Sequence, residues 1–290
     1  MKKIIITLCV IAAAALAAGS LYAVAGNLVD KVSENNAFTG SGDIVTRTFE
    51  LDAFSAVRAR HSAHVTVVEG SGPVTVRVDD NMAPYVIVRV EKGRLVVGFD
   101  DQVRSTRNVT FEVTVPCDGK LTELKASGAS KIIVEPILSN DRIELDASGA
   151  SKIVAMVECL KCEIDASGAS KIEAGGVADV CEADASGASK ISLAVRSKQC
   201  ELDASGASKI AAQGNADRCD LDASGASSID AEALKTLDAA AESSGSSSVR
   251  LYCTRSLRAS ASGAGKIAYR CDGPVSLSTN SSGAGRIKQL

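Results

Sequence analysis

The sequence predicts an all-β protein. We expect a right-handed parallel β-helix (solenoid) of about nine coils, each of about 19 residues, preceded by a β-rich N-terminal portion that contains hairpins. Three observations carry this prediction. The hexapeptide ASGASK occurs five times, and its glycine returns at a nearly constant spacing. A β-branched residue stands four positions after each such glycine. Small or apolar residues alternate with charged ones before the glycine, which is the two-residue period of a strand.

The repeat occupies residues 121–290. Its glycines are spaced by 21, 19, 19, 19, 19, 20, 18 and 20 residues; they are Gly128, Gly149, Gly168, Gly187, Gly206, Gly225, Gly245, Gly263 and Gly283. A flexible linker has no physical reason to keep such a register. A unit this short cannot bury its apolar face alone, so successive units must stack as coils. With coils about 4.8 Å apart, the stack would be on the order of 40 Å long, and right-handed winding is usual for parallel crossovers.

The SGAS segment is the expected corner of each coil. Glycine tolerates a backbone angle that alanine or serine would resist, and the flanking serines can bond to neighbouring backbone groups. The motif does not fit a phosphate-binding loop, because a strand rather than a helix follows it. A nucleotide site is also not needed nine times.

The chain begins with a predicted export signal. Residues 1–25 combine a basic start, a long apolar run and a terminal Ala-Val-Ala pattern, which predicts a cleaved secretory signal peptide. The alternative is an uncleaved membrane anchor, since the apolar run is long enough to span a bilayer. Residues 26–39 show no pattern and are expected to form a tether.

Residues 40–120 alternate with a period of two and are rich in β-branched residues. This pattern predicts strands throughout the segment, as a β-rich N-terminal part of one domain. The turn residues at 69–73 and at 91–94 predict two tight hairpin connections.

The strand before each corner predicts a ladder of carboxylates. Aspartates stand three positions before the glycine at Asp146, Asp165, Asp184, Asp203 and Asp222, and acids stand five positions before it at Glu144, Glu163, Glu182, Glu201 and Asp220. We favour a solvated face whose charge is partly offset, across the corner, by Lys131, Lys152, Lys171, Lys190 and Lys209. The alternative is weak binding of calcium by the aspartate ladder, because Ca²⁺ binds clustered oxygens. No other metal or cofactor is expected.

The cysteines predict a second column, inside the coils. Cys162, Cys181, Cys200 and Cys219 stand at the same position of consecutive coils, and Ile143 takes this position in the coil before them. We expect buried thiols there. Cys253 and Cys271 also match each other on neighbouring coils, and the sequence leaves open whether they form a disulfide.

The two histidines, His61 and His64, are expected to be ordinary strand residues on opposite faces. Neither has a nucleophile or a paired acid nearby in the pattern. No catalytic residue is predicted.

The segments "GSGDIVTRTFELDAFSAVRARHSAHVTVVEGSG", "NMAPYVIVRVEKGRLVV" and "VTFEVTVP", followed by the repeated glycine turns, resemble the auto-transporter adhesin head GIN domain family of Bacteroidetes. The resemblance covers residues 40–290. It implies a right-handed β-helix similar in structure to pectin-lyase-type solenoids, with no established catalytic set. It also implies a role in cell-surface adhesion.

The expected function is that of a non-enzymatic exported β-solenoid for adhesion or binding, located in the periplasm, at the outer membrane surface or outside the cell. Its ligand would be a surface glycan or protein, with self-association along the solenoid as a further expectation. A net charge of −3 gives no indication of nucleic acid binding. The alternative is a polysaccharide lyase or hydrolase on a pectin-lyase-like β-helix. Such enzymes need a localised cluster of acids and bases, whereas the acids here are spread evenly.

Overall fold

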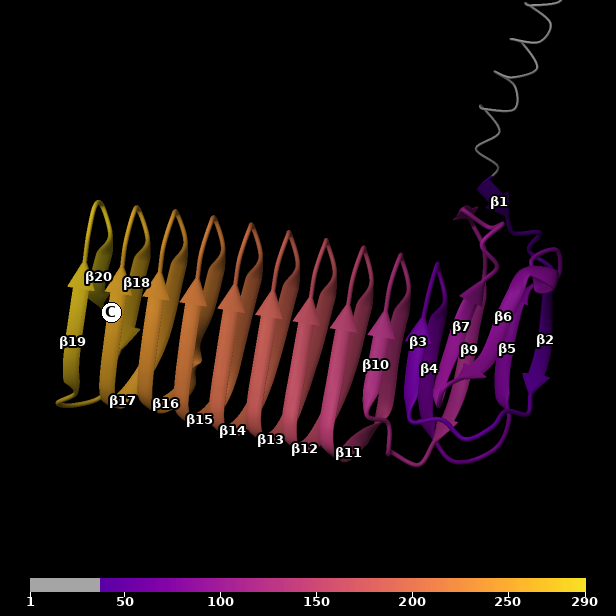
Figure 1. Cartoon of the computed structure of the whole chain (residues 1–290), viewed down its shortest axis with the longest axis horizontal. Coiled ribbons are helices and arrows are strands. Elements are labelled where there is room, and N and C mark those ends of the chain that lie inside the picture. The colour runs from indigo at the N-terminus through magenta and orange to yellow at the C-terminus, as the bar shows by residue number, and fades with distance from the viewer. Residues whose placement is uncertain (1–36) are drawn as a thin grey trace, which may run out of the picture.

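The computed structural model describes residues 37–290, which are β-structure almost throughout (Figure 1). One short 3-10 turn, η1 (Ala83–Tyr85), interrupts the strands. No helix in this part of the chain is long and apolar enough to cross a membrane. The predicted signal peptide and most of the predicted tether lie outside the described residues. The last three residues assigned to the tether form the short strand β1 (Ala37–Thr39), which pairs in parallel with β8 (Ser105–Arg107).

The repeat forms the predicted parallel β-solenoid. Figure 1 shows its strands side by side along one axis, with all the glycine corners on one edge. Neighbouring coils pair in parallel and in register over most of their length. The strands are β10 (Glu123–Ala126), β11 (Lys131–Ala147), β12 (Lys152–Ala166), β13 (Lys171–Ala185), β14 (Lys190–Ala204), β15 (Lys209–Ala223), β16 (Ser228–Ser243), β17 (Ser248–Ala261), β18 (Lys266–Arg270), β19 (Ser276–Ser281) and β20 (Arg286–Gln289).

The core is a set of straight columns of small and branched side chains. The isoleucine four positions after each corner is buried in every coil from Ile132 to Ile229, and the alternate residues before the corner, such as Ala183 and Ala185, are buried as well. Each column member packs on its equivalent in the next coil because the strands are in register. The alternation predicted from the sequence is therefore the alternation of core and surface.

The nine corner glycines all lie in the left-handed region, with φ between 63° and 74°. A Cβ atom on Gly187 would lie only 2.8 Å from the carbonyl oxygen of Gly168 in the preceding corner. The buried serine two positions after the glycine ties the coils together: the Ser189 hydroxyl donates to the carbonyl oxygen of Ala166 at 2.9 Å. Both the backbone angle and the stacking distance require glycine at the corner.

The N-terminal portion consists of strands that continue the stack and strands that cover its end. Its other strands are β2 (Ile44–Phe49), β3 (Ala56–Ala59), β4 (His64–Glu69), β5 (Val74–Asp79), β6 (Val86–Glu91), β7 (Arg94–Phe99) and β9 (Phe111–Cys117). β3 pairs in parallel with β10, and β4 pairs in parallel with β11. Residues 56–69 therefore form a further coil, so the stack begins earlier in the chain than the predicted boundary at residue 121.

The predicted hairpins have different outcomes. The connection at 91–94 is a tight hairpin, with Lys92 and Gly93 at positive φ between the antiparallel strands β6 and β7. The hairpin predicted at 69–73 is wrong, because β9 lies between β4 and β5. Val113 of β9 is the register partner of Val65 on one side and of Val76 on the other.

Candidate functional site

The carboxylates before the corners form one continuous surface, which we call the acidic face. Parallel pairing in register places each aspartate beside that of the next coil, as in the pairs Asp165–Asp184 and Asp184–Asp203. None of its ten side chains is buried. They are Glu144, Asp146, Glu163, Asp165, Glu182, Asp184, Glu201, Asp203, Asp220 and Asp222.

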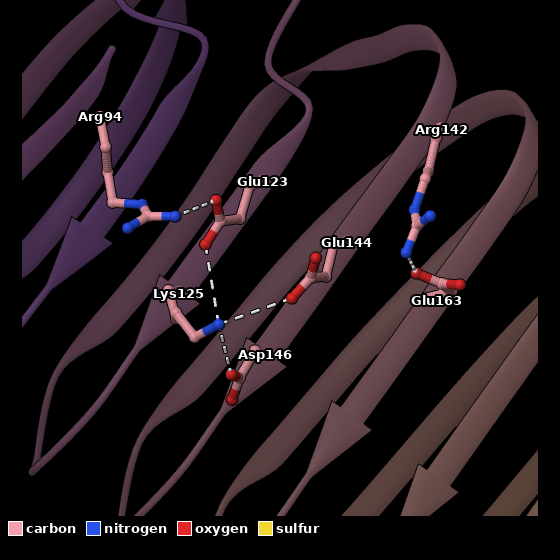
Figure 2. Close-up of polar contacts among 7 residues, drawn as sticks. All are labelled: Arg94, Glu123, Lys125, Arg142, Glu144, Asp146 and Glu163. Atoms are coloured by element: carbon pink, nitrogen blue, oxygen red, sulfur yellow. Dashed lines mark hydrogen bonds and ion pairs between the residues drawn. The ribbon is translucent and has the colours of Figure 1, made fainter. Parts of the chain in front are cut away.

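Basic residues meet the acidic face at its N-terminal end (Figure 2). The Lys125 Nζ atom lies 2.9 Å from the carboxylate of Asp146, 3.5 Å from that of Glu144 and 3.7 Å from that of Glu123. The hydrogen bond with Asp146 is the main reason why the pKa of Lys125 is raised. Arg94 of β7, which is separated from β10 by β3, completes the group, with its guanidinium 2.6 Å from Glu123. The sequence did not single out Lys125, because it interrupts the aspartate ladder in one coil only.

The glutamate ladder has two further basic partners. Lys161 contacts Glu163 at 2.8 Å and Glu182 at 2.9 Å. Arg142 pairs with Glu163 (Figure 2). These contacts lower the pKa of Glu163, with the hydrogen bond from Lys161 as the largest cause. Both cations stand seven positions before a corner glycine, so they lie beside the glutamates.

The aspartate ladder beyond Asp146 has no such partner. Among the ion pairs of residues 37–290, none includes Asp165, Asp184 or Asp203. Loss of contact with water, followed by repulsion from neighbouring carboxylates, raises the pKa of Asp203 to about 6. The pKa values of Asp165 and Asp184 are also raised, mainly by partial burial. This part of the acidic face therefore holds its negative charge at an electrostatic cost.

The lysine column lies on the other side of the corner and does not touch the acidic face. Lys152 and Lys171 both contact Glu173, which stands on their own side of the coil. Within the described residues, the ion pairs with the acidic face come from Lys125, Arg142 and Lys161 instead. The charge offset predicted across the corner is therefore not made by direct contact.

The acidic face does not enclose a metal site. In residues 37–290, no group of three or more histidine, cysteine or carboxylate side chains is arranged to hold a metal ion. The carboxylates project side by side from a regular sheet, whereas Ca²⁺ requires six to eight oxygens around one point. Weak calcium binding by the aspartate ladder stays a prediction.

A groove of about 820 Å³ lies on the strands that follow the corners, across β12–β16. Its lining includes small residues, among them Ala155, Ala174, Gly175 and Ala194, together with Met156. The sequence signal for this groove is the alanine that stands six positions after the corner glycine in most of these strands, as at Ala155 and Ala174. That signal is masked by the many alanines of the core.

The cysteine column is buried, as predicted. Cys162, Cys181, Cys200 and Cys219 are at most 1% exposed and oppose one another in register. All eight cysteines of the described residues carry free thiols, so Cys253 and Cys271 do not form a disulfide in the structure.

The histidine prediction is wrong for His61, which lies in a turn with φ of 61° rather than in a strand. Its Nδ1 atom accepts a hydrogen bond from the backbone N–H of Phe99 at 3.2 Å, and burial lowers its pKa. His64 begins β4, where it lines a small surface cavity with Arg77, Glu112 and Lys131. The hydrogen bond from Phe99 gives His61 a structural role.

The comparison with known protein families covers most of this architecture. Residues 53–193 and 178–273 match the family described as "Putative auto-transporter adhesin, head GIN domain". The chain belongs to this family. The GIN-domain match spans the coil of β3 and β4 and continues through the whole acidic face.

Solved structures share the fold of this GIN-domain chain. A putative adhesin from Parabacteroides distasonis ATCC 8503 matches with a TM-score of 0.67 and 20% identity, over 88% of this chain and 100% of that one. A putative lipid binding protein from the same organism matches with a TM-score of 0.65 and 18% identity, over the same shares. A putative adhesin from Parabacteroides merdae ATCC 43184 matches with 0.55 and 21%, over 88% and 99%. At these identities the likeness establishes the fold alone. No curated protein matches the chain.

Proposed function

We propose that this protein is an exported, non-enzymatic binding protein that serves in adhesion at the cell surface or in the envelope. The observation that supports this function is the acidic face, in which the same pair of carboxylates recurs on five consecutive coils. Evenly repeated groups on a rigid surface suit a ligand that makes many weak contacts at once. Membership of a family described as an adhesin head supports the same function.

The regularity of the acidic face favours binding over catalysis. Hydrolysis of a glycosidic bond requires two carboxylates with different roles, held in different environments around one bond. On the acidic face, the carboxylate pair of one coil is repeated on the next. The alternative function, a polysaccharide lyase or hydrolase, would need one coil to differ from its neighbours.

The charge of the acidic face favours a ligand that carries positive charge, on a protein or on a glycan. The aspartate ladder lacks basic partners from Asp165 onward among the described residues, so a cationic ligand would relieve its internal repulsion. Binding of this kind weakens as salt is added, because exposed charges are screened.

The experiment is an array of glycans and matrix proteins probed with the purified protein, combined with analysis of every polysaccharide for shorter products. We expect saturable binding that decreases at high salt, with no polysaccharide shortened. Cleavage of a polysaccharide would overturn the proposal in favour of a lyase or hydrolase. Absence of binding to every protein and glycan on the array would also count against an adhesin.

A matched pair of variants locates the binding surface. Replacing Asp165, Asp184 and Asp203 by asparagine should weaken binding at least tenfold, because it removes the uncompensated charge. Replacing Lys152 and Lys171 by glutamine, on the other side of the corner, should leave binding unchanged. Equal binding by both variants would exclude the acidic face as the ligand site.

Export has its own test. Processing of the predicted signal peptide should give a mature protein that starts at Gly26, measured by mass spectrometry of the envelope fraction. Protease treatment of intact cells then separates surface exposure, where the protein is digested, from a periplasmic location. Retention of residues 1–25 on the mature protein would favour the membrane anchor.

A further inference from the structure

Cys159 and Cys162 form a Cys-x-x-Cys pair at the bend of β12. Cys162 belongs to the buried core, and Cys159 packs against that core. Cys162 is only 1% exposed, whereas Cys159 is partly exposed. One thiol is therefore partly accessible from solvent, and the other is buried in the core.

The bend places both cysteines on the inner side of the coil. The pairing of β12 with β13 includes Cys159 opposite Ala178 and Lys161 opposite Val180, but it omits Leu160, which is 57% exposed. In a straight strand, side chains three positions apart point to opposite faces. Because the chain turns at Leu160, both cysteine positions instead face the inside of the coil, as Ala178 and Cys181 do in the next coil, where each is 1% exposed.

This pair occurs in only one of the coils that carry the cysteine column. The position of Cys159 is occupied by Ala178, Ser197 and Ala216 on the next three coils, although the cysteine column itself continues. Cys181, Cys200 and Cys219 thus have no accessible partner of this kind. This coil therefore carries a cysteine at a position where the next three coils carry alanine or serine.

The environment assigns different roles to the two thiols. The hydrogen bond that Cys159 receives from Cys162 lowers the pKa of Cys159. The hydrogen bonds of Cys162 with Cys159 and Cys181, together with burial, raise the pKa of Cys162. Since Cys159 is the more accessible of the two thiols and the thiolate is the nucleophilic form, Cys159 is the thiol that reacts first.

We propose that Cys159 and Cys162 form a thiol–disulfide exchange site whose substrate is a low-molecular-weight disulfide. The thiolate of Cys159 attacks one sulfur of the substrate, which breaks the substrate S–S bond and releases one thiolate. The sulfur of Cys162, after losing its proton, attacks the Sγ atom of Cys159, forms the Cys159–Cys162 disulfide and releases the second thiolate. The two protein thiols are oxidised, the substrate is reduced, and the two protons end on the two released thiols.

A small substrate fits the accessibility of the site. Cys159 is only partly exposed, and it lies between the exposed side chains of Glu158 and Leu160. A small disulfide reaches its Sγ atom with less obstruction than a disulfide held in a folded protein. Glutathione disulfide is therefore the probe of choice.

The test incubates the purified, reduced protein with glutathione disulfide and follows it by intact mass and peptide mapping. We expect one Cys159–Cys162 disulfide, two molecules of glutathione released per chain, and no glutathione attached. The Cys162→Ala variant should stop at a mixed disulfide of glutathione with Cys159. The Cys159→Ala variant should lose the reaction, and the Cys271→Ala variant, which changes another partly exposed cysteine, should react like the native protein.

Both alanine variants are compatible with the fold, since Ala239 already stands in the column of Cys162 and Ala178 in that of Cys159. A measurement without variants is limited labelling of the native protein with iodoacetamide, which should modify Cys159 before any cysteine of the buried column. Oxidation of Cys159→Ala at the native rate would overturn the proposal. So would an unmodified Cys159 in the folded Cys162→Ala variant, or a native disulfide between Cys162 and Cys181.

Discussion

The corner of the first ASGASK coil lies directly on a histidine: a Cβ atom on Gly128 would be 3.1 Å from the carbonyl oxygen of His61. That oxygen accepts a hydrogen bond from the backbone N–H of Ala129 at 2.8 Å, and both stacked residues are left-handed, with φ of 74° and 61°. At each corner, a Cβ would point toward the preceding coil. In the layer before His61, residues 100–110 join β7 to β9 without such a corner. His61 therefore has room for a side chain, whereas a Cβ atom on a corner glycine would meet the backbone of the corner before it.

The first prediction concerns this stacking. Gly187→Ala should lower the free energy of unfolding by about 2–3 kcal/mol, because it adds both an unfavourable φ and a contact of 2.8 Å with the carbonyl oxygen of Gly168. The matched control is Gly93→Ala, which has φ of 75° but no atom within 4 Å of the new Cβ. It should cost about 1 kcal/mol, the penalty of the backbone angle alone. Guanidinium unfolding measures both, and equal losses would contradict the stacking argument.

The second prediction concerns the repeat as a unit. Deletion of residues 187–205 removes one whole coil, including β14, and joins two identical corner sequences. Because each coil contacts mainly its neighbours, the shortened protein should remain a cooperatively unfolding β protein of lower stability. Circular dichroism and the denaturant m-value measure this, and the m-value should decrease with the buried area.

The control for this deletion removes only residues 187–195, about half a coil. It leaves the core columns without continuation, so the truncated protein should lose its cooperative transition. If both deletions unfolded the chain, the solenoid would not behave as a stack of independent coils.

The columns of the solenoid could be predicted from the sequence because each column repeats one sequence position. Ile172 and Ile191 each stand four positions after a corner glycine, so the regular spacing of the glycines predicts that both are buried. The coil at residues 56–69 could not be predicted in this way, since its corner is His61 rather than an SGAS turn. The placement of β9 between β4 and β5 depends on the pairing of Val113 with Val65 and Val76, which leaves no local pattern.

The same distinction holds for the surface. The acidic face could be predicted because its carboxylates recur at two fixed positions. Its ion pairs could not, because Lys125 occupies its position in a single coil and because basic residues occupy the position of Lys161 in only some of the coils. The Cys159–Cys162 contact depends on the bend at Leu160, and strand alternation predicts the opposite orientation for residues three positions apart.

The third prediction concerns Lys125, which is surrounded by three carboxylates at the end of the acidic face. Lys125→Met keeps the aliphatic stem but leaves Glu123, Glu144 and Asp146 to repel one another. We expect a loss of about 1 kcal/mol in the free energy of unfolding at pH 7 and low salt, limited by contact of these side chains with water. The loss should shrink at pH 3, where the carboxylates become protonated.

Lys198→Met is the matched control, because Lys198 forms one ion pair with Asp179 and is 72% exposed at the side chain. Its loss should stay below about 0.5 kcal/mol. Chemical denaturation at low and high salt measures both variants. A Lys125→Met loss no larger than that of the control would mean that the carboxylates around Lys125 act as separate solvated groups.

The last prediction is a pH dependence set by Asp203. Partial burial and neighbouring carboxylates raise its pKa to about 6, above the usual value near 4, so the folded state binds more protons than the unfolded state between pH 4 and 6. The destabilising contribution of Asp203 therefore decreases as pH falls from 7.5 toward 5. Asp203→Asn should raise the free energy of unfolding at pH 7.5 by about 1 kcal/mol or less, since solvent screens the charge, and should have a smaller effect at pH 5, where Asp203 is mostly protonated in the folded state but not in the unfolded state.

Asp238→Asn provides a control of opposite sign. Hydrogen bonds from Arg255 and Ser256 lower the pKa of Asp238, so its stabilising contribution is present above its unfolded pKa and is lost only at lower pH. This variant should be destabilised to the same extent at pH 5 and at pH 7.5. Thermal unfolding at the two pH values distinguishes the pair. An Asp203→Asn effect of equal size at both would mean that the aspartate ladder is fully charged at pH 5, and that its repulsion is too weak to favour a cationic ligand.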